Sequence, residues 1–205
     1  MSKRLNRKFA ISRRIGASLW GTDKDPYNKK NYPPGVHGNT GYRKITEYGT
    51  QLLAKQKLKK YYGDIREKQF KRIYKEASRR KGDTGENLIG LLESRLDAFI
   101  YRSNFTQTIF ASRQFITHKH IQVNEKIVNI PSFRLKPGDT VKIKDNSKDL
   151  LKLLKSKERN NKDTLQYIKI DDSNSQAIFV KIPILKEVPF PVEMEPNLVV
   201  EFYSR

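Results

Sequence analysis

The chain changes its hydrophobic periodicity along its length, and these changes predict the order of its elements. Before about residue 48, turn formers are frequent and apolar periodicity is weak, which predicts an extended segment with one short helix. Between residues 51 and 118, apolar residues recur at the three- and four-residue spacing of amphipathic helices. From His120 onward, alternating apolar residues predict short strands joined by tight turns.

These patterns predict an α+β protein without internal repeats. We expect helices at 51–62, 67–81, 88–101, 108–118 and 149–157, the third being either continuous or broken near Glu93. The expected strands cover 121–123, 127–128, 133–135, 141–143, 166–170, 177–182 and 198–202.

The net charge of the chain predicts a polyanionic binding partner. Lys and Arg total 42 against 22 Asp and Glu, so the 205-residue chain carries a net charge of +20. Residues 1–92 hold 23 basic and 8 acidic side chains, a net +15, which concentrates the charge in the first half. Hydrophobic residues make up 36% of the chain, enough for a packed core.

Composition also excludes several classes of protein. The chain has no cysteine, which excludes disulfides, thiolate zinc sites and cysteine nucleophiles. No stretch approaches the ~18 consecutive apolar residues of a membrane span, and the N-terminus lacks a signal-peptide core. Residues 1–14 fit either a mitochondrial presequence or a basic RNA-binding arm, and we favour the arm.

Two basic helices form the first candidate interface. Only Asp64, Glu67 and Glu76 are available nearby for ion pairing, so this surface repels itself unless phosphates neutralise it. A solvated helix face is the alternative. The cations within these 27 positions are Lys55, Lys57, Lys59, Lys60, Lys68, Lys71, Arg72, Lys75, Arg79, Arg80 and Lys81.

A helix–helix–hairpin segment from Arg95 to Ile143 forms the second candidate interface. Arginine grips phosphate in a fork and stacks on exposed bases, which suits RNA. Arg95 fits equally well as a structural partner of Asp97. His118 and His120 lack a third metal ligand, and no catalytic motif is present, so we expect no metal, no cofactor and no enzyme activity.

Several motifs of this segment resemble the RNA-binding module named after ribosomal protein S-four. They are Leu92-Glu93-Ser94-Arg95-Leu96-Asp97, Ala111-Ser112-Arg113-Gln114, His118-Lys119-His120-Ile121, Val123-Asn124, Asn129-Ile130-Pro131-Ser132 and Pro137-Gly138-Asp139. The flanks continue the likeness to the S-four family of small-subunit ribosomal proteins, of the bacterial and organellar type. Their motifs include Tyr32-Pro33-Pro34-Gly35-Val36-His37-Gly38, Lys81-Gly82-Asp83-Thr84-Gly85-Glu86-Asn87-Leu88 and Leu198-Val199-Val200-Glu201-Phe202-Tyr203-Ser204-Arg205.

The resemblance implies both an architecture and a function. A basic extension (1–44) would lead into a helical domain (45–92, completed by 181–205), with the RNA-binding module inserted at 93–180. The protein would be a structural constituent of the small ribosomal subunit. It would bind rRNA early in assembly at a multi-helix junction, contact ribosomal protein S-five and contribute to decoding accuracy where mRNA enters. The acidic end, 171–205, has a net charge of −3, which suits a protein neighbour.

The candidate contact residues follow from the charge pattern and this resemblance. For mRNA they are Arg43 and Lys44. For rRNA they are Lys3, Arg4, Arg7, Lys8, Arg13, Arg14, Lys55, Lys57, Lys59, Lys60, Lys68, Arg72, Arg95, Arg102, Arg113, Lys119, His120, Asn124, Lys126 and Arg134.

Three positions depart from the family pattern. Lys119 and Glu125 replace glycines that commonly supply a positive φ, at a cost of about 1 kcal/mol each, so either the backbone differs there or bound RNA compensates. Leu53 replaces a frequent arginine. An abundance of Lys, Asn and Ile together with the lost glycines leads us to favour a mitochondrion slightly over a bacterium.

An RNA-modifying enzyme or an RNA chaperone that carries the same module is the alternative function. A modifying enzyme would need a separate catalytic domain, for which the chain has no length left. A chaperone would need only the module. The matching flanks argue against both.

Overall fold

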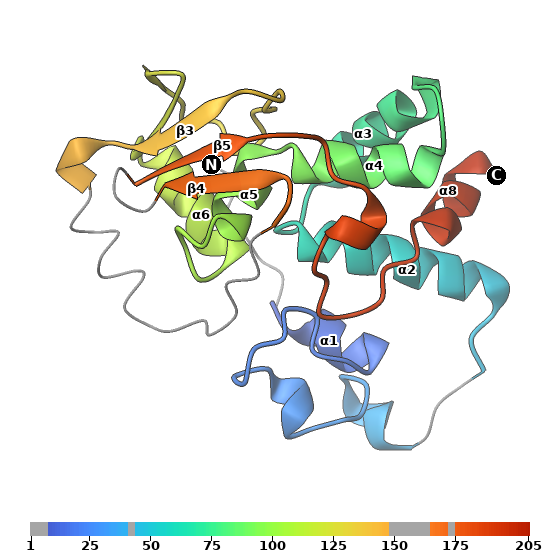
Figure 1. Ribbon diagram of the computed structural model, residues 1–205. Helices are drawn as coiled ribbons and strands as arrows, with labels where there is room; N and C mark the ends of the chain where they lie inside the picture. Colours follow the sequence, from blue (N-terminus) through green and yellow to red (C-terminus); the bar gives the residue numbers. More distant parts are fainter. Residues whose placement is uncertain (1–7, 41–43, 148–164, 172–174) are drawn as a thin grey trace. The chain divides into compact units, whose positions relative to one another are not determined.

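The computed structural model describes residues 8–40, 44–147, 165–171 and 175–205, and it confirms the α+β class (Figure 1). Its α-helices are α1 (Ala10–Ile15), α2 (Glu47–Tyr61), α3 (Glu67–Arg79), α4 (Thr84–Glu93), α5 (Leu96–Arg102), α6 (Ile109–Thr117) and α8 (Pro196–Ser204). Its strands are β1 (Ile121–Val123), β2 (Lys126–Ile127), β3 (Thr140–Ile143), β4 (Ile168–Asp171) and β5 (Gln176–Phe179). Its 3-10 turns are η1 (Pro26–Asn28), η2 (Val36–Asn39), η3 (Asp145–Ser147) and η4 (Leu185–Glu187). The helix expected at 149–157 lies outside the described residues.

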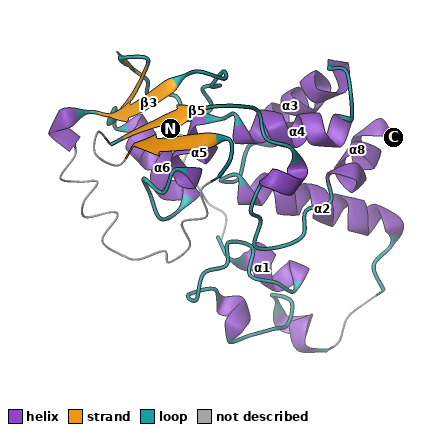
Figure 2. Cartoon of the chain, in the orientation of Figure 1, coloured by secondary structure: helices purple, strands orange, loops and turns teal. Residues whose placement is uncertain are grey.

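The chain divides into two compact units. The N-terminal unit comprises Met1–Phe70 and Pro189–Arg205, and the central unit comprises Lys71–Val188. The strands, orange in Figure 2, belong to the central unit. These limits differ from the expected boundaries at 92/93 and 180/181, which stay a prediction.

An antiparallel sheet in the order β2-β1-β3-β5-β4 organises the central unit. Its inner face carries buried residues from β1, β3 and β5, as alternation along each strand requires. They join side chains of α5 and α6 in one core of fifteen buried residues, which includes Phe99, Phe115 and Phe179. The outer face therefore carries the polar residues of the same strands.

The expected long helix at 88–101 is broken between α4 and α5. Arg95 adopts an extended conformation there and forms an isolated β-bridge with Arg134. The backbone N–H of Leu96 donates to Phe133 (2.8 Å), and that of Leu135 donates to Ser94 (2.8 Å). The strand expected at 133–135 is therefore wrong, since the segment pairs with the helix break and joins no sheet.

The two positions without the usual glycine keep a left-handed backbone. Lys119 has φ +64 and follows α6, where the N–H groups of Lys119 and His120 bond back to Ile116 and Phe115, as in a Schellman motif. Asn124 (φ +47) and Glu125 (φ +65) form the two-residue β1–β2 turn, with both φ values positive as a type I′ turn requires. The backbone is therefore retained and the non-glycine residues are strained.

The N-terminal unit is built on the packing of α2 against α8. Tyr48 of α2 contacts Phe202 (ring centroids 5.6 Å apart), and Gln51 donates to a Glu201 carboxylate oxygen (3.1 Å). The strand expected at 198–202 is wrong, because this segment lies within α8. The helix begins at Pro196, and the Val199 side chain on it is buried.

The segment before α2 buries more than its sequence suggests. Leu19 is fully buried, and Ile11 and Trp20 are each 5% exposed. The Trp20 indole N–H donates to the Tyr61 carbonyl (3.3 Å), and the indole meets Phe9 edge-on. The Trp20 indole thus connects this segment to the end of α2.

Candidate nucleic-acid interface

Helix α3 presents a line of exposed cations. Phe70, Ile73 and Ala77 are buried on one side of the helix, and the cations lie on the other at intervals of three and four residues. Among the described residues, none of these cations has an ion pair or side-chain hydrogen bond. We call them the α3 stripe: Lys68, Lys71, Arg72, Lys75 and Arg79.

Only Lys68 and Arg72 of the stripe are among the contact residues chosen from the sequence. Lys75 and Arg79 lie seven and eleven residues after Lys68, so they share its side of the helix. That spacing is visible in the sequence and identifies the complete stripe. Glu76 lies off the stripe, where it pairs with Arg80 (3.0 Å) and Arg134.

The lysines of α2 are in a different state, because each is paired with a carboxylate. The side chains are only 9–20% exposed. The prediction that too few carboxylates are available to neutralise α2 is therefore wrong. Glu67 pairs with two lysines and Asp64 with a third, and Glu195 comes from the distant C-terminal segment. The pairs are Lys55–Glu67 (3.0 Å), Lys57–Glu195 (3.2 Å), Lys59–Glu67 (3.1 Å) and Lys60–Asp64 (3.0 Å).

The N-terminal cations divide in the same way. Arg13 donates to the carbonyls of Tyr32 (3.0 Å) and Pro33 (3.2 Å) and lies over the Tyr32 ring, so it braces the Pro-Pro-Gly segment. Lys8 lies over the rings of Phe9 and Trp20. Arg14 is exposed and has no partner among the described residues. The candidates Lys3, Arg4, Arg7 and Arg43 lie outside the described residues, whereas Lys44 is exposed.

Asp97 gathers two of the predicted arginines. Arg95 is 2% exposed and grips Asp97 in a fork, with Nε–Oδ1 at 3.0 Å and Nη2–Oδ2 at 2.7 Å. Arg113 reaches Oδ2 of the same carboxylate at 2.9 Å, while its side chain stays 33% exposed. Arg95 is thus held as a structural partner, and Arg113 keeps a face towards solvent.

Arg102 is also buried and paired. Its guanidinium contacts Glu93 (Nη2–Oε1 3.0 Å), and the Tyr167 hydroxyl donates to the other Glu93 oxygen (3.2 Å). Both side chains are almost fully buried. A buried pair of this kind fixes the geometry of α4 and α5 and leaves the arginine little reach towards a ligand.

The exposed cations of the hairpin region are Lys119 and Lys126, which have no partner among the described residues. The Asn124 side chain stabilises the turn, because it accepts a hydrogen bond from the Thr140 N–H (3.0 Å) and donates one to Asp139 (2.8 Å). Arg134 contacts Glu76, and this contact is the main reason why the pKa of Glu76 is lowered.

His120 stacks on Phe115 (4.8 Å between ring centroids) and its Nδ1 bonds to the Ser147 hydroxyl (2.8 Å). Burial lowers the His120 pKa, and the neighbouring charges of His118 and Lys144 lower it further. The lowered pKa favours the neutral imidazole, which can form hydrogen bonds but carries no charge.

The described residues were also compared with the requirements of a metal site and of a membrane-spanning helix. Within them, no group of three or more histidines, aspartates and glutamates is arranged to hold a metal ion. None of the helices in the described part of the chain combines the length and apolar character that a membrane crossing needs.

Comparison with known families defines the class of protein. Residues 3–93 match the family described as "Ribosomal protein S4/S9 N-terminal domain", and residues 94–141 match the "S4 domain". Together the two matches cover α1 to α6 and the β1–β2 hairpin. The chain is therefore a ribosomal protein with an RNA-binding S4 domain.

Full-length relatives narrow this class to one family. Proteins named "Small ribosomal subunit protein uS4" are 58% identical in Bartonella bacilliformis, 56% in Roseobacter denitrificans and 55% in Rhizobium meliloti, each over 205 residues and all of both chains. The chain belongs to the uS4 family. It is a structural component without enzyme activity, as predicted, and the relatives are bacterial, so the preference for a mitochondrion finds no support.

Proposed function

We propose that this chain binds small-subunit rRNA early in ribosome assembly, where several rRNA helices meet. The α3 stripe carries the proposal. It runs over the twelve residues from Lys68 to Arg79, about 16 Å along the helix, and presents five cations that no described carboxylate neutralises. Phosphates are the ligands that such a line of donors suits, and contacts of this kind position RNA without reading its sequence.

The S4 domain would supply a second set of contacts. Arg113, Lys119, Lys126 and Arg134 are predicted residues of this domain whose cationic side chains are at least partly exposed, and His120 and Asn124 lie among them in sequence. Arg95 and Arg102 act in this proposal as positioning residues, because each is buried against a carboxylate. The α3 helix and the S4 domain thus each carry exposed cations, which fits binding to more than one rRNA segment.

The proposal keeps two further partners. Lys44 is exposed and, with Arg43, remains the candidate for contact with incoming mRNA. Ribosomal protein S-five remains the candidate neighbour of the C-terminal segment, through which the chain would contribute to decoding accuracy. Glu195 and Glu201 of that segment already bond to Lys57 and Gln51, so the exposed Glu193 is the better candidate for this neighbour.

The bacterial origin of the relatives supports a place in bacterial cytoplasm, on the small ribosomal subunit. Crosslinking the protein in a bacterial extract and sequencing the attached RNA tests the proposal. We expect crosslinks to cluster at one junction of small-subunit rRNA. Recovery of tRNA or scattered transcripts in place of that junction would overturn it.

A further inference from the structure

The outer face of the central sheet carries a row of polar side chains that are not among the proposed phosphate contacts. Residues directly opposite one another in neighbouring strands point to the same side of a sheet. Gln122 faces Lys142, and Lys142 faces Gln176, so these three residues form a polar row across β1, β3 and β5. Thr140 lies two residues before Lys142 and points to the same side.

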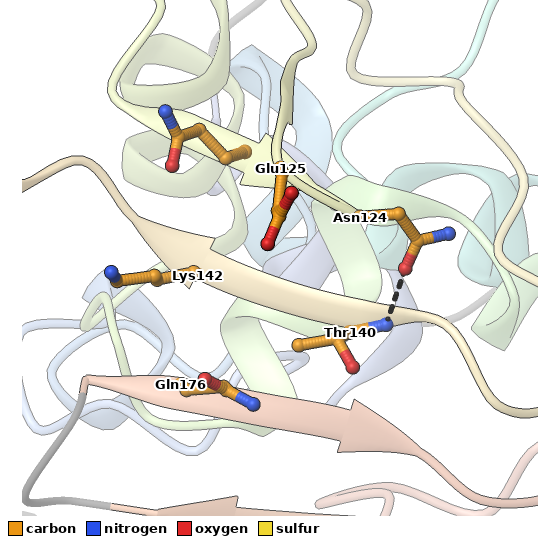
Figure 3. A pocket seen from close by; sticks show the side chains of 6 residues that line it. Asn124, Glu125, Thr140, Lys142 and Gln176 are labelled. Carbon is orange, nitrogen blue, oxygen red and sulfur yellow. Dashed lines mark hydrogen bonds between the residues drawn. The ribbon is translucent and has the colours of Figure 1, made fainter.

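An open depression of about 580 Å³ lies over this row. It is lined by Gln122, Asn124, Glu125, Thr140, Lys142 and Gln176, and its size is in the range of ligand sites. Figure 3 shows the Glu125 side chain directed from the β1–β2 turn over strand β3, on the side where Lys142 and Gln176 lie. The depression belongs wholly to the central unit.

The Glu125 side chain projects from a turn whose backbone is fixed by hydrogen bonds. The Asn124 side chain ties the turn to Thr140 and Asp139, which fixes where Glu125 projects. Glu125 itself makes no hydrogen bond or ion pair with a described residue. Lys142 has one long ion pair, 3.8 Å from the exposed Asp145. The Glu125 carboxylate, an acceptor, and the Lys142 ammonium, a donor, therefore face the same depression, and both can form further hydrogen bonds.

The chemistry of these two groups selects the ligand. A carboxylate only accepts hydrogen bonds and an ammonium only donates them, so the depression presents acceptors beside a donor. Guanine is the base whose pairing edge complements this, because its N1–H and N2 amino group donate while the neighbouring O6 accepts. Adenine, cytosine and uracil place donors and acceptors in other orders. A phosphate is disfavoured, because the Glu125 charge repels it.

We propose that this depression binds an unstacked guanine base of RNA. Glu125 accepts hydrogen bonds from N1–H and the N2 amino group, and Lys142 donates to O6. Unpaired bases that are turned out of a helix are the usual targets of base-specific RNA recognition. The inference rests on the proposed function, since it adds a base-specific contact to a protein that would otherwise contact rRNA mainly through phosphates.

Fluorescence anisotropy of the full chain with labelled nine-residue oligouridylates tests this inference. The central position would be guanine, adenine, cytosine or inosine. We expect the guanine oligonucleotide to bind about five- to tenfold more tightly than the adenine and cytosine ones. Inosine, which lacks the N2 amino group, should fall in between. Free GMP serves as a competitor and separates a nucleotide site from an RNA site.

Two variants of equal charge change sharpen the result. Glu125→Gln should abolish the guanine preference, whereas Glu86→Gln, at an exposed position on α4, should retain it. Equal affinity for all four oligonucleotides, or binding of GMP without a guanine preference in RNA, would overturn the inference and leave phosphate binding intact. Loss of binding to every oligonucleotide and to small-subunit rRNA would overturn the proposed function as well.

Discussion

Tyr203 donates a hydrogen bond to Glu67 Oε1 at 2.6 Å, which joins the C-terminal helix α8 to the first turn of α3. Lys55 and Lys59 contact the same carboxylate. Burial of Glu67 acts to raise its pKa, but the hydrogen bonds from Tyr203, Lys55 and Lys59 together outweigh this and lower the pKa to about 2. Burial and the bond to Glu67 raise the Tyr203 pKa.

This cluster predicts a loss of stability in acid. The pKa of Glu67 is lower in the folded chain than its ordinary value of 4.5, so its contribution is complete above pH 4.5 and disappears as the pH falls towards 2. Tyr203→Phe should reduce the free energy of unfolding at pH 7 by about 1 kcal/mol, because the partly exposed carboxylate is screened by water. Urea unfolding of both proteins between pH 7 and pH 2 measures this.

The difference between wild type and Tyr203→Phe should shrink towards zero across the same interval of pH. Other carboxylates also weaken in acid, but their effect is common to both proteins and cancels in the difference. A difference that stays constant down to pH 2 would show that the bond to ionised Glu67 contributes nothing.

Asp97→Asn should be strongly destabilising. The substitution removes the charge that faces the buried Arg95 and leaves that guanidinium uncompensated, at a cost of about 3–5 kcal/mol. Arg113→Gln is the matched control, because its partly exposed ion pair with the same carboxylate should contribute less than about 1 kcal/mol. Chemical denaturation separates the two, and equal losses would contradict the structural role of Arg95.

Glycine at either strained position should stabilise the protein. Lys119→Gly and Glu125→Gly each relieve a left-handed residue that carries a side chain, which we expect to add up to about 1 kcal/mol to the free energy of unfolding. Lys75→Gly, within α3, should have the opposite sign and cost about 1 kcal/mol. Thermal unfolding midpoints show whether each substitution stabilises or destabilises the protein. Destabilisation by all three substitutions would show that the left-handed residues are not strained.

Local periodicity predicted most of the helices, because their apolar positions repeat within single turns. The two-residue break at Ser94 and Arg95 was visible only as an alternative, since a bridge to Arg134, far along the chain, enforces it. Helix α8 was mistaken for a strand because Val199 and Val200 favour strands, whereas its contacts with α2 decide the outcome. Such long-range contacts leave no local pattern.

In the candidate site, too, some features follow from the local sequence and others depend on long-range contacts. Charge density alone could not separate the cations of α2 from those of α3, although their surroundings differ completely. Lys57 finds Glu195 at a separation of 138 residues, and no local count of carboxylates predicts that pair. The α3 stripe could be predicted, because its spacing and its few acidic neighbours are both local. The buried state of Arg95 and Arg102 depends on the core around them.

We propose that the α3 stripe, whose cations have no ion pair among the described residues, holds rRNA phosphates, and that the paired lysines of α2 do not. The most direct test is the salt dependence of binding to small-subunit rRNA for Lys75→Gln/Arg79→Gln and for Lys57→Gln/Lys60→Gln. We predict that the α3 pair flattens the slope of log Kobs against log salt by about one for each cation removed, while the α2 pair leaves it unchanged. An unchanged slope for the α3 pair together with a flatter slope for the α2 pair would contradict the account.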